Sequence, residues 1–337
     1  MSGERAAPCT MTWSARRERW PLKFVARISG YTFTEIEVLT VTLRQGNYQG
    51  SGEASGVYYR NDSPAQMETQ LKALQRDVER GVTRGALLEM LPPGGARNAL
   101  DSALWDLEAK RQHRSVWEIV GVKAPQSLVT THTIGADEPQ QMAQTALALR
   151  GAQALKLKLT GDAVDAERVL AVRAARKDAC LAVDANQGFS RSKLERLLPA
   201  LVDAEVTMIE QPLPVGSESE LQGLRSPIPI AADESAQTSA DVASLVGRFD
   251  IVNIKLDKCG GLTSALEMLE VAREAGLKAM VGNMFGTSLA MAPAFVLGQL
   301  CDYVDLDGPL ALASDRVPGV VYESGRIWCP PEIWGAP

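Results

Sequence analysis

The amino-acid sequence predicts an α/β fold, with a barrel of parallel strands that alternate with helices and a smaller α+β domain before it. In the second half of the chain, short apolar runs that each end in a charged residue recur at intervals of 22 to 26 residues. Such an interval accommodates one strand, one helix and two loops. Between the runs, residues 162–179 and 263–275 carry apolar side chains at three- and four-residue spacing, as amphipathic helices do. Repeated strand–helix units of this length close most naturally into a barrel.

The N-terminal third follows a different pattern. Residues 36–43 alternate between apolar and polar side chains, as a half-buried antiparallel strand does, and residues 48–54 are the expected return strand. Helical patterns follow at residues 63–81 and 96–110. These elements predict an α+β domain that packs on the barrel.

The first 19 residues contain several arginines but no apolar core of a secretory signal. We expect residues 1–19 to form a disordered extension. Either Met1 or Met11 is then the native start of translation.

The barrel strands are placed by the charged residues that end them. The five apolar runs end at Lys158, Asp184, Glu210, Asp233 and Lys255. The same interval extended backward reaches His132 within residues 127–134, and extended forward it reaches Gly282 and then Asp305. This gives eight strands between about residues 127 and 307. Because the carboxyl ends of parallel barrel strands meet at one mouth, the five charges are expected to converge there.

Composition fits a cytoplasmic enzyme. The 337 residues are 45% hydrophobic and 23% charged, with a formal net charge of −6, which argues against nucleic acid or an anionic membrane as partner. No apolar stretch approaches the roughly 20 residues of a membrane span. The five cysteines are scattered and lack metal-ligand spacing, as reduced thiols in the cytoplasm do. With only two histidines, a zinc site built from several histidines is disfavoured.

Three carboxylates, Asp184, Glu210 and Asp233, end three consecutive predicted strands. A single strand-end carboxylate most often caps the following helix. Three in register instead favour a metal site, because hard oxygen donors with open positions suit Mg²⁺. We therefore expect Mg²⁺ at this point of the mouth.

Two lysines of one strand, Lys156 and Lys158, point the same way because side chains alternate along a strand. The leucines around them require burial, so both ammonium groups are expected to face the mouth, opposite Lys255. Neighbouring cations disfavour a charged lysine and should lower its pKa towards the range of a general base. A metal that holds a carboxylate between two lysines favours removal of the α-proton on one face and return on the other. A resting salt bridge between Lys255 and Asp233 or Asp184 is compatible with this role.

Five motifs carry a resemblance to a known family. They are residues 155–159 (LKLKL), 183–186 (VDAN), 209–214 (IEQPLP), 232–235 (ADES) and 252–262 (VNIKLDKCGGL), and residues 96–107 (ARNALDSALWDL) resemble a helix of the same family. The chain resembles the enolase superfamily, its muconate-lactonising subgroup and, within it, the dipeptide epimerases of the L-Ala-D/L-Glu epimerase kind. The likeness extends from about Trp20 to nearly the end of the chain.

The resemblance implies a modified TIM barrel, (β/α)7β, with an α+β capping domain formed by the N-terminal region and the C-terminal tail. The expected boundaries are residues 20–125 for the capping domain, 126–310 for the barrel and 311–337 for a segment that returns to the capping domain. The resemblance also implies that Asp184, Glu210 and Asp233 bind Mg²⁺ and that Lys158 and Lys255 are the acid/base pair. Lys156 would assist the substrate carboxylate, and Lys258, three residues past the strand end, is the rival of Lys255.

The narrower assignment depends on Asp305 and Asp307 after the eighth strand. In dipeptide epimerases such a pair holds the free amino terminus of the substrate, although an Asp-x-Asp can also cap a loop. Substrate preference is expected from capping-domain loops, and the candidate specificity residues are Arg27, Tyr31, Tyr58 and Arg60. In relatives that act on Ala-Glu an arginine of the first loop pairs with the glutamate, whereas Gly30 stands near that position here.

We therefore expect an isomerase, a Mg²⁺-dependent dipeptide epimerase that inverts the C-terminal residue of an L,L-dipeptide by two-lysine proton transfer through a metal-stabilised enolate. One alternative is an o-succinylbenzoate synthase or muconate cycloisomerase reaction of the same subgroup, whose anionic substrates the two aspartates would repel. A second alternative is a catalytically silent barrel that binds small acids or peptides. The resemblance also implies that the chain can form a homo-oligomer.

Overall fold

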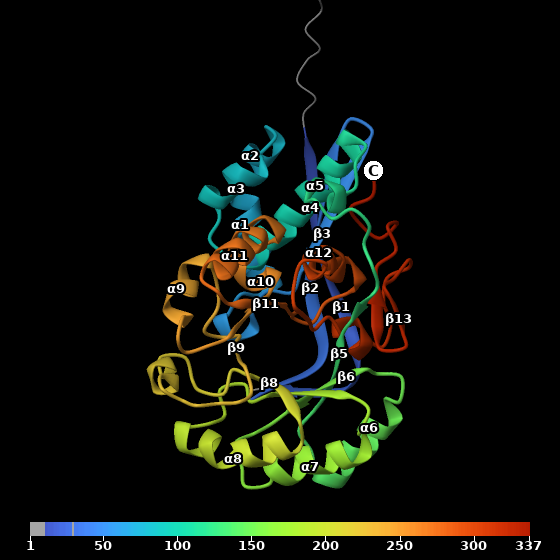
Figure 1. Ribbon diagram of the computed structural model, residues 1–337. Coiled ribbons are helices and arrows are strands. Elements are labelled where there is room, and N and C mark those ends of the chain that lie inside the picture. The colour runs from blue at the N-terminus through green and yellow to red at the C-terminus, as the bar shows by residue number, and fades with distance from the viewer. Residues whose placement is uncertain (1–10, 29) are drawn as a thin grey trace, which may run out of the picture.

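The computed structural model describes residues 11–28 and 30–337 (Figure 1). An antiparallel sheet of three strands comes first, with β1 at Thr12–Ile28, β2 at Tyr31–Gln45 and β3 at Tyr48–Ala54. Four helices follow, α1 at Pro64–Ala73, α2 at Gln75–Glu79, α3 at Arg84–Met90 and α4 at Gly95–Gln112. Ser63 starts α1, since its hydroxyl accepts a hydrogen bond from the Gln66 N–H at 3.4 Å and Pro64 occupies the first helical position. This part of the chain is the capping domain, and it confirms the predicted strand pair.

Strand β1 corrects one expectation. Residues 12–19 pair with residues 37–44 of β2, so the predicted disordered extension is wrong for them. Residues 1–10 lie outside the described part of the chain. Charged residues such as Arg16, Arg17 and Arg19 obscured the strand pattern, because they lie on a strand whose partner is fixed only by the tertiary fold.

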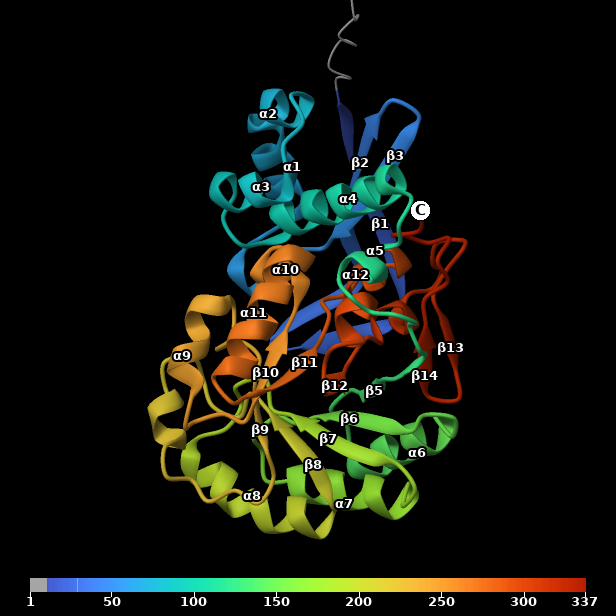
Figure 2. The same cartoon turned by 45° about the horizontal axis from the view of Figure 1, so that its top comes forward.

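The barrel is an eight-stranded parallel sheet whose strands follow sequence order (Figure 2). The strands are β5 (Thr131–Ile134), β6 (Ala154–Lys158), β7 (Cys180–Asp184), β8 (Val206–Glu210), β9 (Ile230–Ala232), β10 (Ile251–Ile254), β11 (Lys278–Val281) and β12 (Tyr303–Val304). Helices cover the outside of the sheet, namely α6 (Pro139–Ala148), α7 (Asp165–Ala175), α8 (Arg191–Asp203), α9 (Val242–Leu245), α10 (Leu256–Cys259), α11 (Leu262–Glu274) and α12 (Ser288–Gly298). The connection from β8 to β9 carries only the 3-10 helix η2 (Glu218–Leu221), and η3 (Ser239–Asp241) precedes α9.

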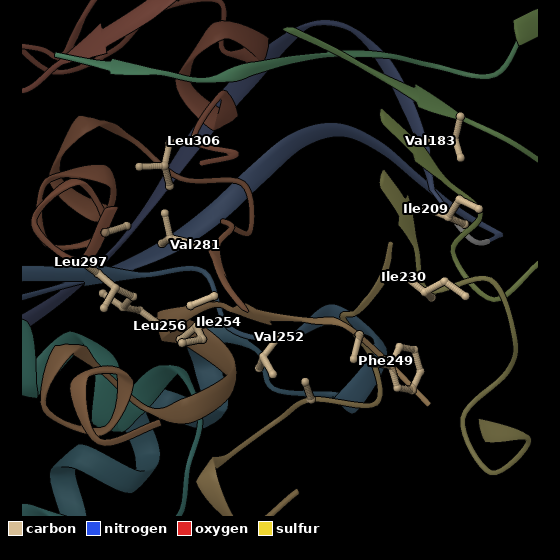
Figure 3. Close-up of a cluster of buried hydrophobic side chains, with 14 of the residues drawn as sticks. Val183, Ile209, Ile230, Phe249, Val252, Ile254, Leu256, Val281, Leu297 and Leu306 are labelled. Atoms are coloured by element: carbon tan, nitrogen blue, oxygen red, sulfur yellow. The ribbon is translucent and has the colours of Figure 1, made fainter. Parts of the chain in front are cut away.

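Alternation along the strands separates two cores. Outward-facing side chains pack against the helices, and Figure 3 shows part of this cluster, in which Val183, Ile209, Ile230 and Val252 come from four successive strands. Inward-facing side chains fill the barrel interior as a second cluster of Ala182, Met208, Ala231, Ile251 and Met280. Since side chains two positions apart share a face, Asp184 and Glu210 follow Ala182 and Met208 into the interior at the mouth.

The remaining elements join the two parts. The predicted strand at residues 127–134 is divided at Thr130, because β4 (Leu128–Val129) leaves the barrel and pairs with β14 (Arg326–Trp328) beside β13 (Val321–Glu323). Short helices are η1 (Tyr58–Arg60), α5 (Val116–Ile119) and η4 (Gly308–Ala311). The C-terminal segment reaches α4, where the Trp334 Nε1–H donates to the Ser102 carbonyl at 3.0 Å. Within the described residues, none of the helices combines the length and the apolar character that a membrane span requires.

Candidate active site at the barrel mouth

The charged strand ends come together as predicted. Lys158, Asp184 and Glu210 are register partners on the adjacent strands β6, β7 and β8. Asp233 directly follows β9, and Lys255 directly follows β10. The three carboxylates are at most 2% exposed, although a buried charge is costly unless it is paired. Each therefore needs a cation.

Lysines supply these cations in the structure. The Lys158 Nζ donates to the Asp184 Oδ2 at 2.6 Å and to the Asn186 Oδ1 at 2.9 Å. The Lys255 Nζ donates to the Asp233 Oδ2 at 2.7 Å. Lys258 is fully buried and donates to the other Asp233 oxygen, Oδ1, at 2.6 Å. Lys255 lines the cavity at the mouth and Lys258 does not, which favours Lys255 as the reacting lysine of this strand.

The pKa values follow from this crowding. Burial alone would lower the pKa of Lys255, but Asp233 and Glu210 outweigh burial and raise it well above its usual value. The lowering expected from neighbouring cations is therefore wrong for Lys255, and also for Lys156, whose carboxylate partners likewise raise its pKa against burial. Burial and then Asp184 raise the pKa of Glu210 to about 7. The cause is that rotamers bring carboxylates closer to these lysines than other cations.

The donor set suits a hard cation. Glu210 has one buried oxygen, Oε2, without a hydrogen-bond partner, and its nearest cation is the Lys156 Nζ at 3.2 Å. Along residues 11–28 and 30–337, no three His, Cys, Asp or Glu side chains are gathered as a formed metal site, because the carboxylates are drawn to lysines. Three carboxylates from adjacent strand ends with an unpartnered oxygen among them are the chemistry that Mg²⁺ requires.

Asp305 and Asp307 close the other side of the mouth. Asp305 is 2% exposed, and its two oxygens accept hydrogen bonds from the Lys156 ammonium and the Thr131 hydroxyl. Asp307 is half-buried, and its Oδ2 accepts the backbone N–H of Thr133 at 2.8 Å. The two aspartates therefore face strand β5, beside Lys156.

A cavity of about 570 Å³ joins these groups to the capping domain. Its polar lining comprises Lys156, Lys158, Asn186, Asp233, Glu234, Lys255, Asn283, Asp305 and Asp307. The capping domain adds mainly apolar and aromatic side chains, namely Phe24, Val25, Ala26, Ile28, Tyr58 and Tyr59. A volume of this size holds a small ligand.

The predicted specificity residues have different positions. Tyr58 lines the cavity, and Tyr31 packs edge-to-face against it with ring centroids 4.9 Å apart. Arg60 is not in the cavity lining and donates to the Gln237 Oε1 at 3.0 Å. Arg27 belongs to β1, but its side chain is outside the described part of the structure.

Two site residues were missed by the sequence reasoning. Asn186 accepts from Lys158, and its amide donates weakly to the Glu234 Oε1 at 3.4 Å. Burial, with Asp233 and Asp184, raises the pKa of Glu234 to about 7, and its Oε2 is buried without a hydrogen-bond partner. Their only signal is position, since each follows a strand-end aspartate by one or two residues.

Comparison with known families identifies both parts of the chain. Residues 10–121 match the mandelate racemase / muconate lactonizing enzyme N-terminal domain, and residues 139–332 match the enolase C-terminal domain-like family. The L-Ala-D/L-Glu epimerase of Escherichia coli is 39% identical over 92% of this chain and 97% of its own. The N-acetyl-D-glutamate racemase of a Pseudoalteromonas species is 40% identical over 86% of this chain and 92% of its own.

A solved structure agrees with the fold. The dipeptide epimerase of Methylococcus capsulatus, complexed with Mg and the dipeptide L-Arg-D-Lys, is 33% identical with a TM-score of 0.88. The alignment covers 95% of this chain and 97% of that one. The predicted barrel with its capping domain is confirmed, and the protein is an isomerase of the racemase and epimerase class. The chain belongs to the mandelate racemase / muconate lactonizing enzyme family of the enolase superfamily.

Proposed function

We propose that the protein is a Mg²⁺-dependent dipeptide epimerase that inverts the α-carbon of the C-terminal residue of an L,L-dipeptide. The observation that carries the proposal is the placement of two lysines, Lys158 from β6 and Lys255 after β10, in the lining of one cavity. Both are held by carboxylates at the strand ends between them. Two acid/base groups at separate points of one cavity are what inversion at carbon requires.

The roles of the chain's own residues follow from these contacts. Lys158, once neutral, takes the α-proton on one face of the substrate, and Lys255, whose pKa is raised, donates a proton on the other. For the D isomer the two roles are exchanged. Asp184, Glu210 and Asp233 would hold Mg²⁺, which supplies positive charge for the substrate carboxylate when bound. Lys156 would support that carboxylate from the neighbouring position on β6.

The N-terminal end of the substrate distinguishes the alternatives. Asp305 and Asp307 supply negative charge where a dipeptide carries its ammonium group. Succinylbenzoate precursors and muconate are anionic and would be repelled there. An N-acetylated amino acid, the substrate type in the name of the Pseudoalteromonas relative, has no ammonium group to use these carboxylates. A silent barrel would bury the same charges without benefit, which is costly.

The test is exchange at the α-carbon. The protein is incubated with Mg²⁺ in D₂O and a library of L,L-dipeptides, and mass spectrometry and chiral chromatography detect deuterium and the L,D isomer. We expect both products together for at least one dipeptide, and loss of both when a chelator removes the metal, with recovery on adding Mg²⁺. Absence of exchange with every dipeptide would reject the proposal, and exchange with N-acetylglutamate or succinylated acids alone would favour the alternatives.

Single-lysine variants test the two roles. Lys158→Ala and Lys255→Ala should each abolish epimerisation, and each should retain proton exchange with only one stereoisomer, because one base remains on one face. Lys177→Ala is the matched control, since Lys177 is an exposed lysine outside the cavity lining. If either active-site variant kept full activity with both isomers, the two-lysine assignment would be wrong.

A further inference from the structure

The two aspartates after β12 differ in what already binds them. Both oxygens of Asp305 are engaged, Oδ1 by the Thr131 hydroxyl and Oδ2 by the Lys156 ammonium. Asp305 is buried and has no free oxygen for a ligand. It therefore resembles a counter-ion of Lys156 rather than an open binding group.

Asp307 has the opposite character. Its Oδ2 accepts one backbone N–H, that of Thr133 at 2.8 Å, and it lines the cavity in a half-buried position. Within the part of the chain that the structure describes, no cation forms an ion pair with Asp307 and no donor binds its Oδ1. A half-buried carboxylate with one open oxygen can accept a ligand ammonium.

The backbone holds this difference in place. Between the two aspartates, the Leu306 N–H donates to the Thr130 hydroxyl at 2.8 Å, and the Leu306 carbonyl accepts the Tyr322 hydroxyl at 2.7 Å. The peptide between the two carboxylates is thus fixed on both sides, so they cannot readily exchange places.

We propose that Asp307 alone binds the ammonium group of the substrate, and that Asp305 is a positioning residue that fixes Lys156 at the reacting end. This inference rests on the proposed function and divides a pair that would otherwise share one role. Asp307 thereby sets the preference for substrates with a free amine. Asp305 acts on every substrate, whether or not it carries an amine, because it acts through Lys156.

Two substrates separate these roles. The L-alanyl dipeptide that exchanges fastest in the screen above is compared with its propionyl counterpart, which replaces the ammonium group by hydrogen. Asp307→Asn should raise KM for the alanyl dipeptide by about 10- to 100-fold, as expected for loss of a hydrogen-bonded charge pair, with kcat nearly unchanged. The same variant should leave the KM of the propionyl compound unchanged.

Asp305→Asn should lower kcat for both substrates by the same factor and leave the ratio of their KM values unchanged. Thr131→Val is the matched second variant, since it removes the other bond to Asp305 and touches neither Asp307 nor the cavity lining. It should show a weaker form of the same kcat effect. Thermal melting of each variant establishes that it is folded.

A selective rise in KM for the alanyl dipeptide in Asp305→Asn, equal to that in Asp307→Asn, would overturn the division and return both residues to amine binding. An equal effect of Asp307→Asn on both substrates would also overturn it. These results differ from failure of the proposed function, in which the unaltered protein exchanges no dipeptide at all and the inference is rejected with it.

Discussion

Asp257 is a buried carboxylate two residues after Lys255 that binds no lysine or arginine among the described residues. It accepts the backbone N–H of Gly56 at 2.8 Å and that of Ser55 at 3.1 Å. The segment that leads to Tyr58 and Tyr59 in the cavity is thereby tied to the end of β10. The capping-domain wall and one reacting lysine share this anchor.

The stability of the protein should depend on pH through Asp257. Burial raises its pKa from 3.8 to about 7, so the folded state binds a proton more readily than the unfolded chain. The stabilisation is present below the unfolded pKa and is lost as pH rises towards 7, by at most about 1.4 kcal/mol per pH unit. Asp257→Asn keeps an acceptor for Gly56 and should remove this part of the pH dependence.

Urea unfolding between pH 5 and 8 measures this effect as the difference between the unaltered protein and Asp257→Asn. Other carboxyls with raised pKa, such as Asp101, are common to both proteins and cancel in the difference. A difference that does not change with pH would contradict the assignment of the raised pKa to Asp257.

At the residue scale, the sequence was sufficient for side chains on regular strands. Lys158, Asp184 and Glu210 were placed because strand alternation and the apolar runs determine where they point. Asn186 was not, because it lies beyond the strand in a loop with φ of +40°, which no pattern encodes. The lysine pKa direction was wrong for Lys255 because it depends on distances that only the folded chain defines.

Among the elements, the contact between β3 and α4 is the closest. A Cβ atom at Gly52 would lie 2.2 Å from the Ala99 carbonyl oxygen and 2.6 Å from the Ala103 nitrogen, both backbone atoms of α4. The two backbones approach only because glycine has no side chain. Nearly all of α4 is buried by this contact and by the barrel.

Gly52→Ala should therefore destabilise the protein by about 3 kcal/mol or more, because the helix must move or the strand must shift. Gly85→Ala is the matched control, since Gly85 lies within α3 with no atom near its Cβ position. The control should be stabilised by about 0.5–1 kcal/mol through helix propensity. Denaturant melts of the two variants measure both changes, and equal stability of the pair would refute the close contact.

Element prediction succeeded where the pattern was local. Strands β2 and β3 and helix α4 were predicted from alternation and helical spacing. The division of residues 127–134 at Thr130 was not, because β4 leaves the barrel to pair with β14, almost 200 residues later. The absence of an α-helix between β8 and β9 was not indicated by the strand interval either, which counts residues and not their conformation.

At the scale of the whole molecule, the barrel was predicted by its repeat, whereas the seat of the capping domain was not. Arg97 of α4 forms that seat, since its guanidinium donates to the Cys259 carbonyl at 2.5 Å, the Gly260 carbonyl at 3.3 Å and the Ser264 hydroxyl at 3.1 Å. Its fourth partner is the Leu91 carbonyl in its own domain at 3.2 Å. Contacts between residues more than 160 positions apart leave no trace in a local pattern.

Loss of Arg97 should weaken both parts of the molecule together. Arg97 is 6% exposed, and Arg97→Ala leaves several buried carbonyls without donors, which should lower the free energy of unfolding by about 2–4 kcal/mol. Arg80→Ala, an exposed arginine of the same domain, is the matched control and should change stability by less than about 0.5 kcal/mol. Urea unfolding followed by circular dichroism and by tryptophan fluorescence should shift to lower denaturant by the same amount, because the two domains share this contact. Two separate transitions in Arg97→Ala, with the later one unshifted, would show instead that the barrel keeps its stability without the capping domain.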